Sequence, residues 1–275
     1  MLHLYCLIVL AVASSFAKHV HHYGEPRMGI ANPICDDAKV HLDVDWDGDA
    51  LDYTCPSHYH WPIVESKPLI YCHPPGTKEP SRHYCMHTKL EYDEEPPLSG
   101  NHRPLWPKYG EYRYVPPQRW VHNLEHGGVV LLYHPCGSRA ELAILKSALR
   151  SCLRRHIITP YNKLTKEYPF AMVTWGCKLS LSHADVYVAK AFIMAHAKKG
   201  PEDLGKPGQF DDQLLLPAKV VPGSDFNDTI ICPVNDEYTE VGDYSYGVTN
   251  QGKESVMGND LSRIFFDLAE MLESN

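Results

Sequence analysis

The sequence predicts an α+β protein with a small mixed sheet, two packed helices, several disulfides and an N-terminal extension rich in Cys and His. The first observation behind this prediction is the alternation of strand-like apolar runs with helical periodicity between residues 129 and 199. The second is the presence of nine cysteines in 275 residues. The third is a composition of 44% hydrophobic and 22% charged residues, which indicates a folded chain.

The core elements follow one another from residue 129 onward. Val129–Tyr133 is a continuous apolar run of the kind found in buried strands. Each predicted helix begins with a capping pattern, Ser138 to Glu141 in the first and Ser182 to Asp185 in the second. The expected elements are a strand over 129–133, a helix over 138–157, strand segments over 170–175 and 179–181, and a helix over 182–199.

The first residues predict a secretory signal. Residues 1–17 contain an apolar run that ends in small residues, as a signal peptide does. The run is shorter than the ~20 residues that a bilayer span requires, and no other stretch is long and apolar enough to cross. We therefore expect a secreted or lumenal protein with no transmembrane segment beyond the signal, which leaves membrane attachment open. The net charge of −8 and the lack of a basic block argue against a nucleic-acid partner.

Eight cysteines remain once Cys6 leaves with the signal, and an even number in a secreted chain predicts disulfides. Their connectivity is not readable from the sequence, although proximity favours pairing Cys72 with Cys85 and Cys136 with Cys152. The cysteines expected in disulfides are Cys35, Cys55, Cys72, Cys85, Cys136, Cys152, Cys177 and Cys232.

Four regions are expected along the chain. They are a signal peptide (1–17), a Cys/His-rich N-terminal region (18–95), a core α+β domain (96–204) and an acidic C-terminal region (205–275) ending in an amphipathic helix over 260–272. Whether 18–95 folds independently stays open. In the last region, Asn227-Asp228-Thr229 predicts N-glycosylation at Asn227.

The N-terminal region leaves two metal questions open. Its density of His, with Met86 nearby, suits copper or zinc capture, but without a fixed ligand spacing it is more typical of a solvated surface segment. Residues 43–48 match the first half of an EF-hand calcium loop, yet Thr54 stands where the loop requires Glu. A strand over 41–46 followed by a turn explains the same residues without a metal.

The most informative stretch is Arg119–Gly128, which places His122, Glu125 and His126 directly before the apolar strand. The two histidines are four residues apart, so they point the same way on either a helix or a strand. The Gly pair that follows would end a helix at once, and we therefore predict a strand or a single turn entering one.

This stretch is one of several ordered motifs that resemble a known family. They are Pro96-Pro97-x-Ser99-Gly100-x-His102, Gly110-x-Tyr112, Val121-His122-x-Leu124-Glu125-His126-Gly127, Tyr133-x-Pro135, Trp175-Gly176 and Gly200-Pro201-Glu202. Together they resemble a bacterial exported domain of unknown function whose animal relatives include the tumour protein p53-inducible protein 13 family. The resemblance covers roughly 96–204 and implies a secreted or membrane-anchored protein linked to growth restraint, without established chemistry.

The first function hypothesis is a non-enzymatic module that binds copper or zinc. His102, His122 and His126 would supply nitrogen ligands, with Glu125 as a fourth ligand or as a group orienting an imidazole. The alternative for the same histidines is a structural role, in which they bond buried backbone carbonyls.

Two further hypotheses belong to other classes. His122 to His126 fits the H-x-x-E-H pattern of zinc hydrolases, which requires a helix and a further carboxylate ligand that the sequence does not reveal. The third hypothesis is a protein-binding module that presents the Tyr-rich stretch 109–120 to an unidentified partner. No catalytic residue is assigned, since neither a nucleophile motif nor a free cysteine is expected.

Overall fold

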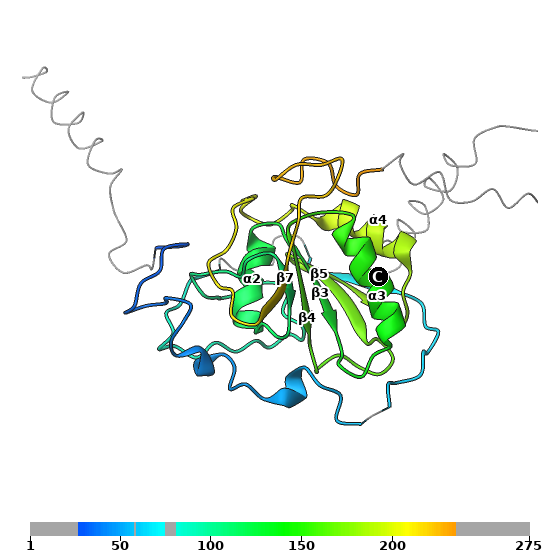
Figure 1. Cartoon of the computed structure of the whole chain (residues 1–275), viewed down its shortest axis with the longest axis horizontal. Helices are drawn as coiled ribbons and strands as arrows, with labels where there is room; N and C mark the ends of the chain where they lie inside the picture. Colours follow the sequence, from blue (N-terminus) through cyan, green and yellow to red (C-terminus); the bar gives the residue numbers. More distant parts are fainter. Residues whose placement is uncertain (1–26, 58, 75–80, 235–275) are drawn as a thin grey trace, which may run out of the picture.

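The computed structural model describes residues 27–57, 59–74 and 81–234 and confirms the α+β class (Figure 1). In this part of the chain the sheet has seven strands and is accompanied by three α-helices, one more than expected. The strands are β1 (Leu69–Cys72), β2 (Gly110–Tyr112), β3 (Val129–Tyr133), β4 (His156–Pro160), β5 (Phe170–Thr174), β6 (Cys177–Leu181) and β7 (Leu214–Pro217). The helices are α2 (Pro117–Glu125), α3 (Arg139–Arg150) and α4 (Val186–His196), with short 3-10 turns at η1 (Leu42–Val44) and η2 (Ala50–Asp52).

The sheet is mixed, with strand order β1-β6-β5-β3-β4-β2-β7. Strand β3 lies at its centre, where it pairs parallel with β4 and antiparallel with β5. Strands β1 and β7 form the two edges, both in antiparallel pairs. The parallel pairs β3–β4 and β4–β2 require crossover connections, and α2 and α3 lie within these connections.

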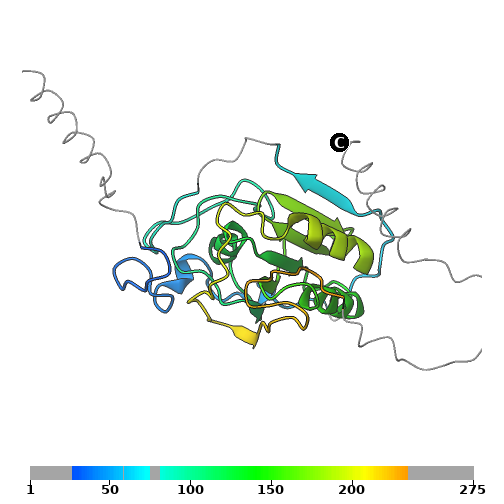
Figure 2. The same ribbon diagram turned by 90° about the horizontal axis from the view of Figure 1, so that it is seen from above.

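Helices cover both faces of the sheet, which explains why β3 is apolar throughout. Val130 and Leu132 belong to the core packed against α2, whereas Val129 and Leu131 belong to the core packed against α3 and α4. Successive strand residues point to opposite faces, so a strand covered on both sides must be apolar at every position. Figures 1 and 2 show α3 and α4 together on one side and α2 on the other.

Both predicted helix caps can be compared with the structure. Ser138 caps α3 and accepts a hydrogen bond from the amide of Glu141, as expected. The helix ends at Arg150, so the predicted extension to Ile157 was wrong, because Cys152 is tied to Cys232 and strand β4 begins at residue 156. Helix α4 begins later than expected, since Asp185 caps it.

All eight predicted cysteines form disulfides, but both pairings suggested by proximity were wrong. The pairs are Cys35–Cys85, Cys55–Cys136, Cys72–Cys177 and Cys152–Cys232. Each bond joins residues at least 50 positions apart, so sequence distance gives no guide to them. Cys72 and Cys177, for example, are partners in the register of the neighbouring strands β1 and β6.

The segment 43–48 is neither a strand nor a calcium loop. Leu42–Val44 forms a 3-10 turn, and the carboxylate of Asp45 is paired with the buried guanidinium of Arg103. A carboxylate committed to an arginine in this way does not face an open cation site. The strand predicted over 41–46 was wrong, because the polar residue Asp45 of its alternating pattern points inward to the ion pair with Arg103.

The Tyr-rich stretch 109–120 is mostly interior, so its predicted role as an exposed interface was wrong. Tyr109, Tyr112 and Trp120 are all buried.

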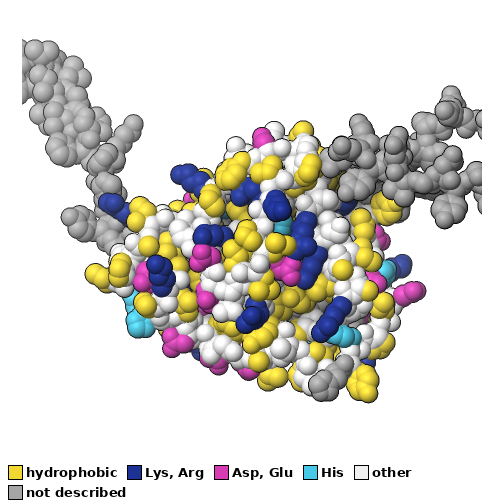
Figure 3. Space-filling view, in the orientation of Figure 1, with side chains coloured by type: hydrophobic (Ala, Val, Ile, Leu, Met, Phe, Trp, Pro, Cys, Tyr) yellow, Lys and Arg dark blue, Asp and Glu magenta, His cyan; other side chains and the backbone are white. Residues whose placement is uncertain are grey.

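On the face shown in Figure 3, basic side chains lie among acidic and hydrophobic ones and form no continuous basic stripe. The described residues contain no helix long and apolar enough to cross a membrane.

Two terminal predictions, the signal peptide (1–17) and the amphipathic helix (260–272), lie outside the described residues. Asn227 is exposed in a turn in which Thr229 bonds to Asp225. N-glycosylation there stays a prediction.

The buried histidine of β4 predicts acid sensitivity. Burial lowers the pKa of His156 to about 4, although its Nδ1 donates to the carbonyl of Leu153. In the unfolded chain this imidazole has an ordinary pKa of about 6.5, so the unfolded state binds a proton more readily than the folded state. The contribution of neutral His156 to the free energy of unfolding is therefore fully present above pH ~6.5 and is lost as the pH falls toward ~4. The contribution is roughly 3 kcal/mol.

His156→Asn keeps a comparable donor and removes the titration. Urea unfolding of the chelator-treated protein should therefore lose less stability between pH ~7 and ~4.5 in this variant than in the wild type. Identical pH profiles in the two proteins would contradict the role of His156.

Candidate metal centre

The central motif lies on the nine-residue helix α2, so the prediction of a strand or a single turn was wrong. Pro117 occupies the first helical turn, where its missing N–H costs no hydrogen bond. Gly127, with a φ of +78°, ends the helix directly after His126. The Gly pair thus terminates a nine-residue helix instead of preventing one. On this helix Glu125 lies beside the two histidines.

The structure brings together four candidate ligands, His83, His102, His122 and Glu125. The Nε2 atom of His102 lies 3.0 Å from Glu125 Oε2 and 3.0 Å from His83 Nε2. His83 Nε2 and Glu125 Oε2 are 3.4 Å apart. The ligand atoms of all four residues lie within 4.8 Å of one another. Three of these residues belong to the group predicted from the sequence, whereas His83 lies in the N-terminal region, outside that group.

Backbone carbonyls fix the orientation of two imidazoles in the cluster. His102 Nδ1 donates to the carbonyl of Gly100 at 2.8 Å, and His122 Nδ1 donates to the carbonyl of Arg103 at 2.6 Å. A carbonyl oxygen only accepts, so Nδ1 carries the proton in both rings. In the neutral tautomer, Nε2 of each ring then holds a free lone pair. This arrangement is typical of metal-binding histidines.

The cluster is enclosed, and its electrostatics suit ligation. His102 is fully buried, and the side chains of Glu125 and His83 are 8% and 16% exposed. Burial, with the neighbouring His102 and His126, lowers the pKa of His122 well below its ordinary value. Burial alone would raise the pKa of Glu125, but the side chains of His102 and His83, which contact its carboxylate, outweigh burial and lower that pKa. A neutral imidazole and an ionised carboxylate are the ligand forms that metals require.

His126, predicted as a ligand together with His102 and His122, belongs to a neighbouring group. The structure places it with Glu125 and Glu202, whose ligand atoms also lie within 4.8 Å of one another. His126 Nε2 is 3.2 Å from Glu202 Oε2, yet neither ring nitrogen of His126 makes a hydrogen bond. The ring of Trp106 packs against both His122 and His126, at 4.7 and 4.5 Å between ring centres.

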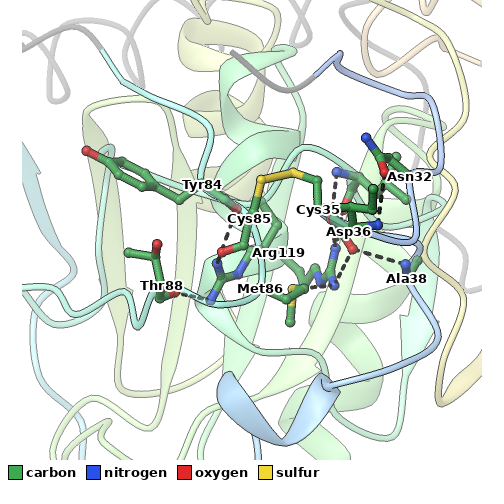
Figure 4. Close-up of a disulfide and its surroundings, with 12 residues drawn as sticks. Asn32, Cys35, Asp36, Ala38, Tyr84, Cys85, Met86, Thr88 and Arg119 are labelled. Carbon is green, nitrogen blue, oxygen red and sulfur yellow. Dashed lines mark hydrogen bonds and ion pairs between the residues drawn. A yellow bond between two sulfur atoms is a disulfide. The ribbon is translucent and has the colours of Figure 1, made fainter. Parts of the chain in front are cut away.

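Backbone hydrogen bonds and a disulfide hold the segment that carries His83 in place. Its backbone bonds to the segment of His102, since Tyr84 N–H donates to the carbonyl of His102. Two residues after His83, Cys85 is joined to Cys35 (Figure 4). Arg103 also donates to the carbonyls of Tyr84 and Cys85. These bonds hold His83 against helix α2, although it is 39 residues distant from His122 in the sequence.

A close approach of two backbones positions Glu202. Its amide donates to the carbonyl of Glu125 at 3.0 Å. A Cβ at Gly200 would lie 2.2 Å from that same carbonyl oxygen and 2.5 Å from the carbonyl oxygen of Leu124. Only glycine allows this contact, which brings the chain after α4 onto the C-terminal end of α2.

A third group, Cys72, Cys177 and His196, has metal-like spacing. Its two sulfurs are joined in a disulfide, so we interpret this group as structural.

Comparison with known proteins agrees with part of the resemblance. Residues 83–208 match the family described as "Protein of unknown function (DUF3105)". This span begins at His83 and includes His102, helix α2 and Glu202, so both candidate ligand groups lie within the matched domain. No curated protein and no solved structure matches the chain, so no named relative supports the specific likeness to p53-inducible protein 13.

Proposed function

We propose that this domain binds one divalent copper or zinc ion through His83, His102, His122 and Glu125. The main observation that supports this proposal is the spacing of the ligand atoms, which is 3.0 to 3.4 Å among His83, His102 and Glu125. In a tetrahedral site with bonds of about 2.0–2.1 Å, neighbouring ligand atoms are about 3.3 Å apart. The spacing therefore supports a shared ion at the centre of the group.

A metal-free hydrogen-bond network is the alternative, and His122 counts against it. In that network His102 would carry two protons and donate to Glu125. The Nε2 atom of His122, however, is buried and has no hydrogen-bond partner. Such an orphaned buried atom is costly to leave unpaired, by about 1–3 kcal/mol. An ion bound to Nε2 would remove that cost.

The donor set favours Cu(II) or Zn(II) over Cu(I). Three imidazoles and a carboxylate suit both divalent ions, whereas Cu(I) prefers thioether or thiolate ligands. The nearby thioether of Met86 faces Arg119, whose Nη2 lies 3.2 Å from the sulfur. The cysteines in the described residues are all held in disulfides.

Metal analysis tests this function. We expect the full-length protein, purified without an affinity tag and supplied with copper or zinc, to retain a tightly bound ion. His122→Ala should abolish retention because it removes a buried ligand. His87→Ala is the matched control, since His87 is exposed and lies only four residues from His83. A wild type that retains neither ion after each is supplied would refute the metal site.

We infer a secreted or lumenal setting and a non-enzymatic role. Four disulfides support an oxidising compartment. The likeness to p53-inducible protein 13 suggests growth restraint and an unidentified protein partner, and this biological assignment rests on the resemblance only.

A zinc hydrolase is the second candidate, because helix α2 and Glu202 supply features that the H-x-x-E-H pattern requires. Against it, Glu125 contacts His102 and His83 instead of remaining free to activate a water. Hydrolysis of a peptide library that disappears in Glu125→Gln with metal retained would favour the hydrolase. Retained metal without turnover in the wild type would exclude it.

A further inference from the structure

We propose that a second divalent ion binds between Glu125, His126 and Glu202, so that Glu125 bridges two ions. The inference rests on the first ion of the proposed function and extends it from one metal to a dinuclear centre. The ligand atoms of this second group lie within 4.8 Å of one another, and Glu125 is common to both groups.

The environment of His126 supports the second ion most strongly. Its side chain is 1% exposed, and neither of its ring nitrogens makes a hydrogen bond. A buried imidazole whose two nitrogens make no hydrogen bond is rare in folded proteins. Its Nε2 atom lies 3.2 Å from Glu202 Oε2, close to the spacing of about 3.3 Å between two ligands of one tetrahedral ion.

Glu125 is placed to serve both positions. Its contacts with His83 and His102 are made by Oε2, which assigns that oxygen to the first ion. The second oxygen of the carboxylate, Oε1, then serves the ion beside His126. A carboxylate shared in this way holds two ions about 3.5–4 Å apart, the separation found in two-metal sites.

The two positions differ in access and therefore in affinity. The first is enclosed by His102, His122 and largely buried Glu125. The second reaches solvent through Glu202, whose side chain is 44% exposed. With three protein ligands, the second ion keeps at least one position for water. We therefore expect it to bind more weakly and to exchange more readily than the first.

The chain geometry around Glu202 depends on the contact at Gly200. The Glu202 amide bonds to the carbonyl of Glu125, and Gly200 lies directly against that carbonyl. The carboxylate is consequently delivered to the end of helix α2, next to His126. Glu202 can be altered without disturbing this backbone contact, because only its amide takes part.

Zinc titration of the full-length, chelator-stripped protein with its disulfides intact tests the proposal. We expect two ions per chain in the wild type, the second at least tenfold weaker than the first. Glu202→Gln should leave the tight ion and lose the weaker one. Glu65→Gln, which alters an exposed carboxylate outside both groups, should bind two ions like the wild type.

Copper supplies a second readout that depends on the bridge. One equivalent of Cu(II) should give the electron paramagnetic resonance spectrum of an isolated ion, and a second equivalent should weaken that signal through magnetic coupling. In Glu202→Gln the isolated spectrum should persist when a second equivalent is added. One tight ion in both proteins, with no coupling, would overturn the second site only, whereas absence of any tight ion would overturn the proposed function itself.

Discussion

Arg119→Met is expected to lower the free energy of unfolding by about 3–5 kcal/mol, because it leaves the carboxylate of Asp36 buried without its cation. The two side chains are 0% and 1% exposed, and their contacts measure 2.6 and 3.0 Å. The guanidinium also lies over the ring of Phe210. Helix α2, which carries the candidate ligands, is tied to the N-terminal segment through this pair (Figure 4).

Urea unfolding with intact disulfides measures this effect. Lys89→Met is the matched control, since the Lys89–Glu91 pair is largely exposed and its loss should leave the unfolding transition nearly unchanged. Asp36→Asn combined with Arg119→Met should recover part of the loss, because no unpaired charge then remains buried. A loss below about 1 kcal/mol in Arg119→Met would contradict the buried-pair interpretation.

Removing the Cys35–Cys85 disulfide is expected to affect both stability and metal affinity. The bond closes a loop of 50 residues, and replacing both cysteines with Ala should cost about 2–5 kcal/mol. It also holds the segment of His83 against helix α2, so we expect metal affinity to fall about 10- to 100-fold, as when groups that support a ligand are lost.

The Cys55–Cys136 bond provides the comparison. It closes a loop of 81 residues, but Cys136 follows the C-terminal end of β3, whereas His126 precedes the N-terminal end. Its removal should therefore destabilise the fold by a similar amount and leave metal affinity unchanged. Affinity is measured below the unfolding transition, with circular dichroism confirming that both variants are folded. Equal affinities in the two variants would refute the supporting role of Cys35–Cys85.

The sequence predicted those elements whose signals are local. Strand β3 and the start of helix α3 follow from an apolar run and a capping Ser, and the structure has both where expected. Helix α2 was missed because it has only nine residues and is followed directly by Gly127. A short segment that stops at a glycine has the same sequence pattern as a turn. Strand β4 was missed because its first residues continue the apolar spacing of α3.

The candidate site was predictable only in part, because its residues meet through tertiary contacts. His122 and Glu125 share a helical turn, and His102 belongs to the motif Ser99-Gly100-x-His102. Nothing in the local sequence distinguishes His83 from the many other histidines of the N-terminal region. The disulfide between Cys85 and Cys35, which forms only in the folded chain, holds it beside helix α2. Glu202 was visible within Gly200-Pro201-Glu202, but only the packing of Gly200 on helix α2 connects it with His126.

The order of the four disulfides has a consequence for a chain that is cut by a protease. The closed loops run over 35–85, 55–136, 72–177 and 152–232, and each overlaps the next. At least one disulfide therefore spans every peptide bond between Cys35 and Cys232. A single cleavage anywhere in this interval leaves the two fragments covalently joined, and they separate only when the disulfides are reduced.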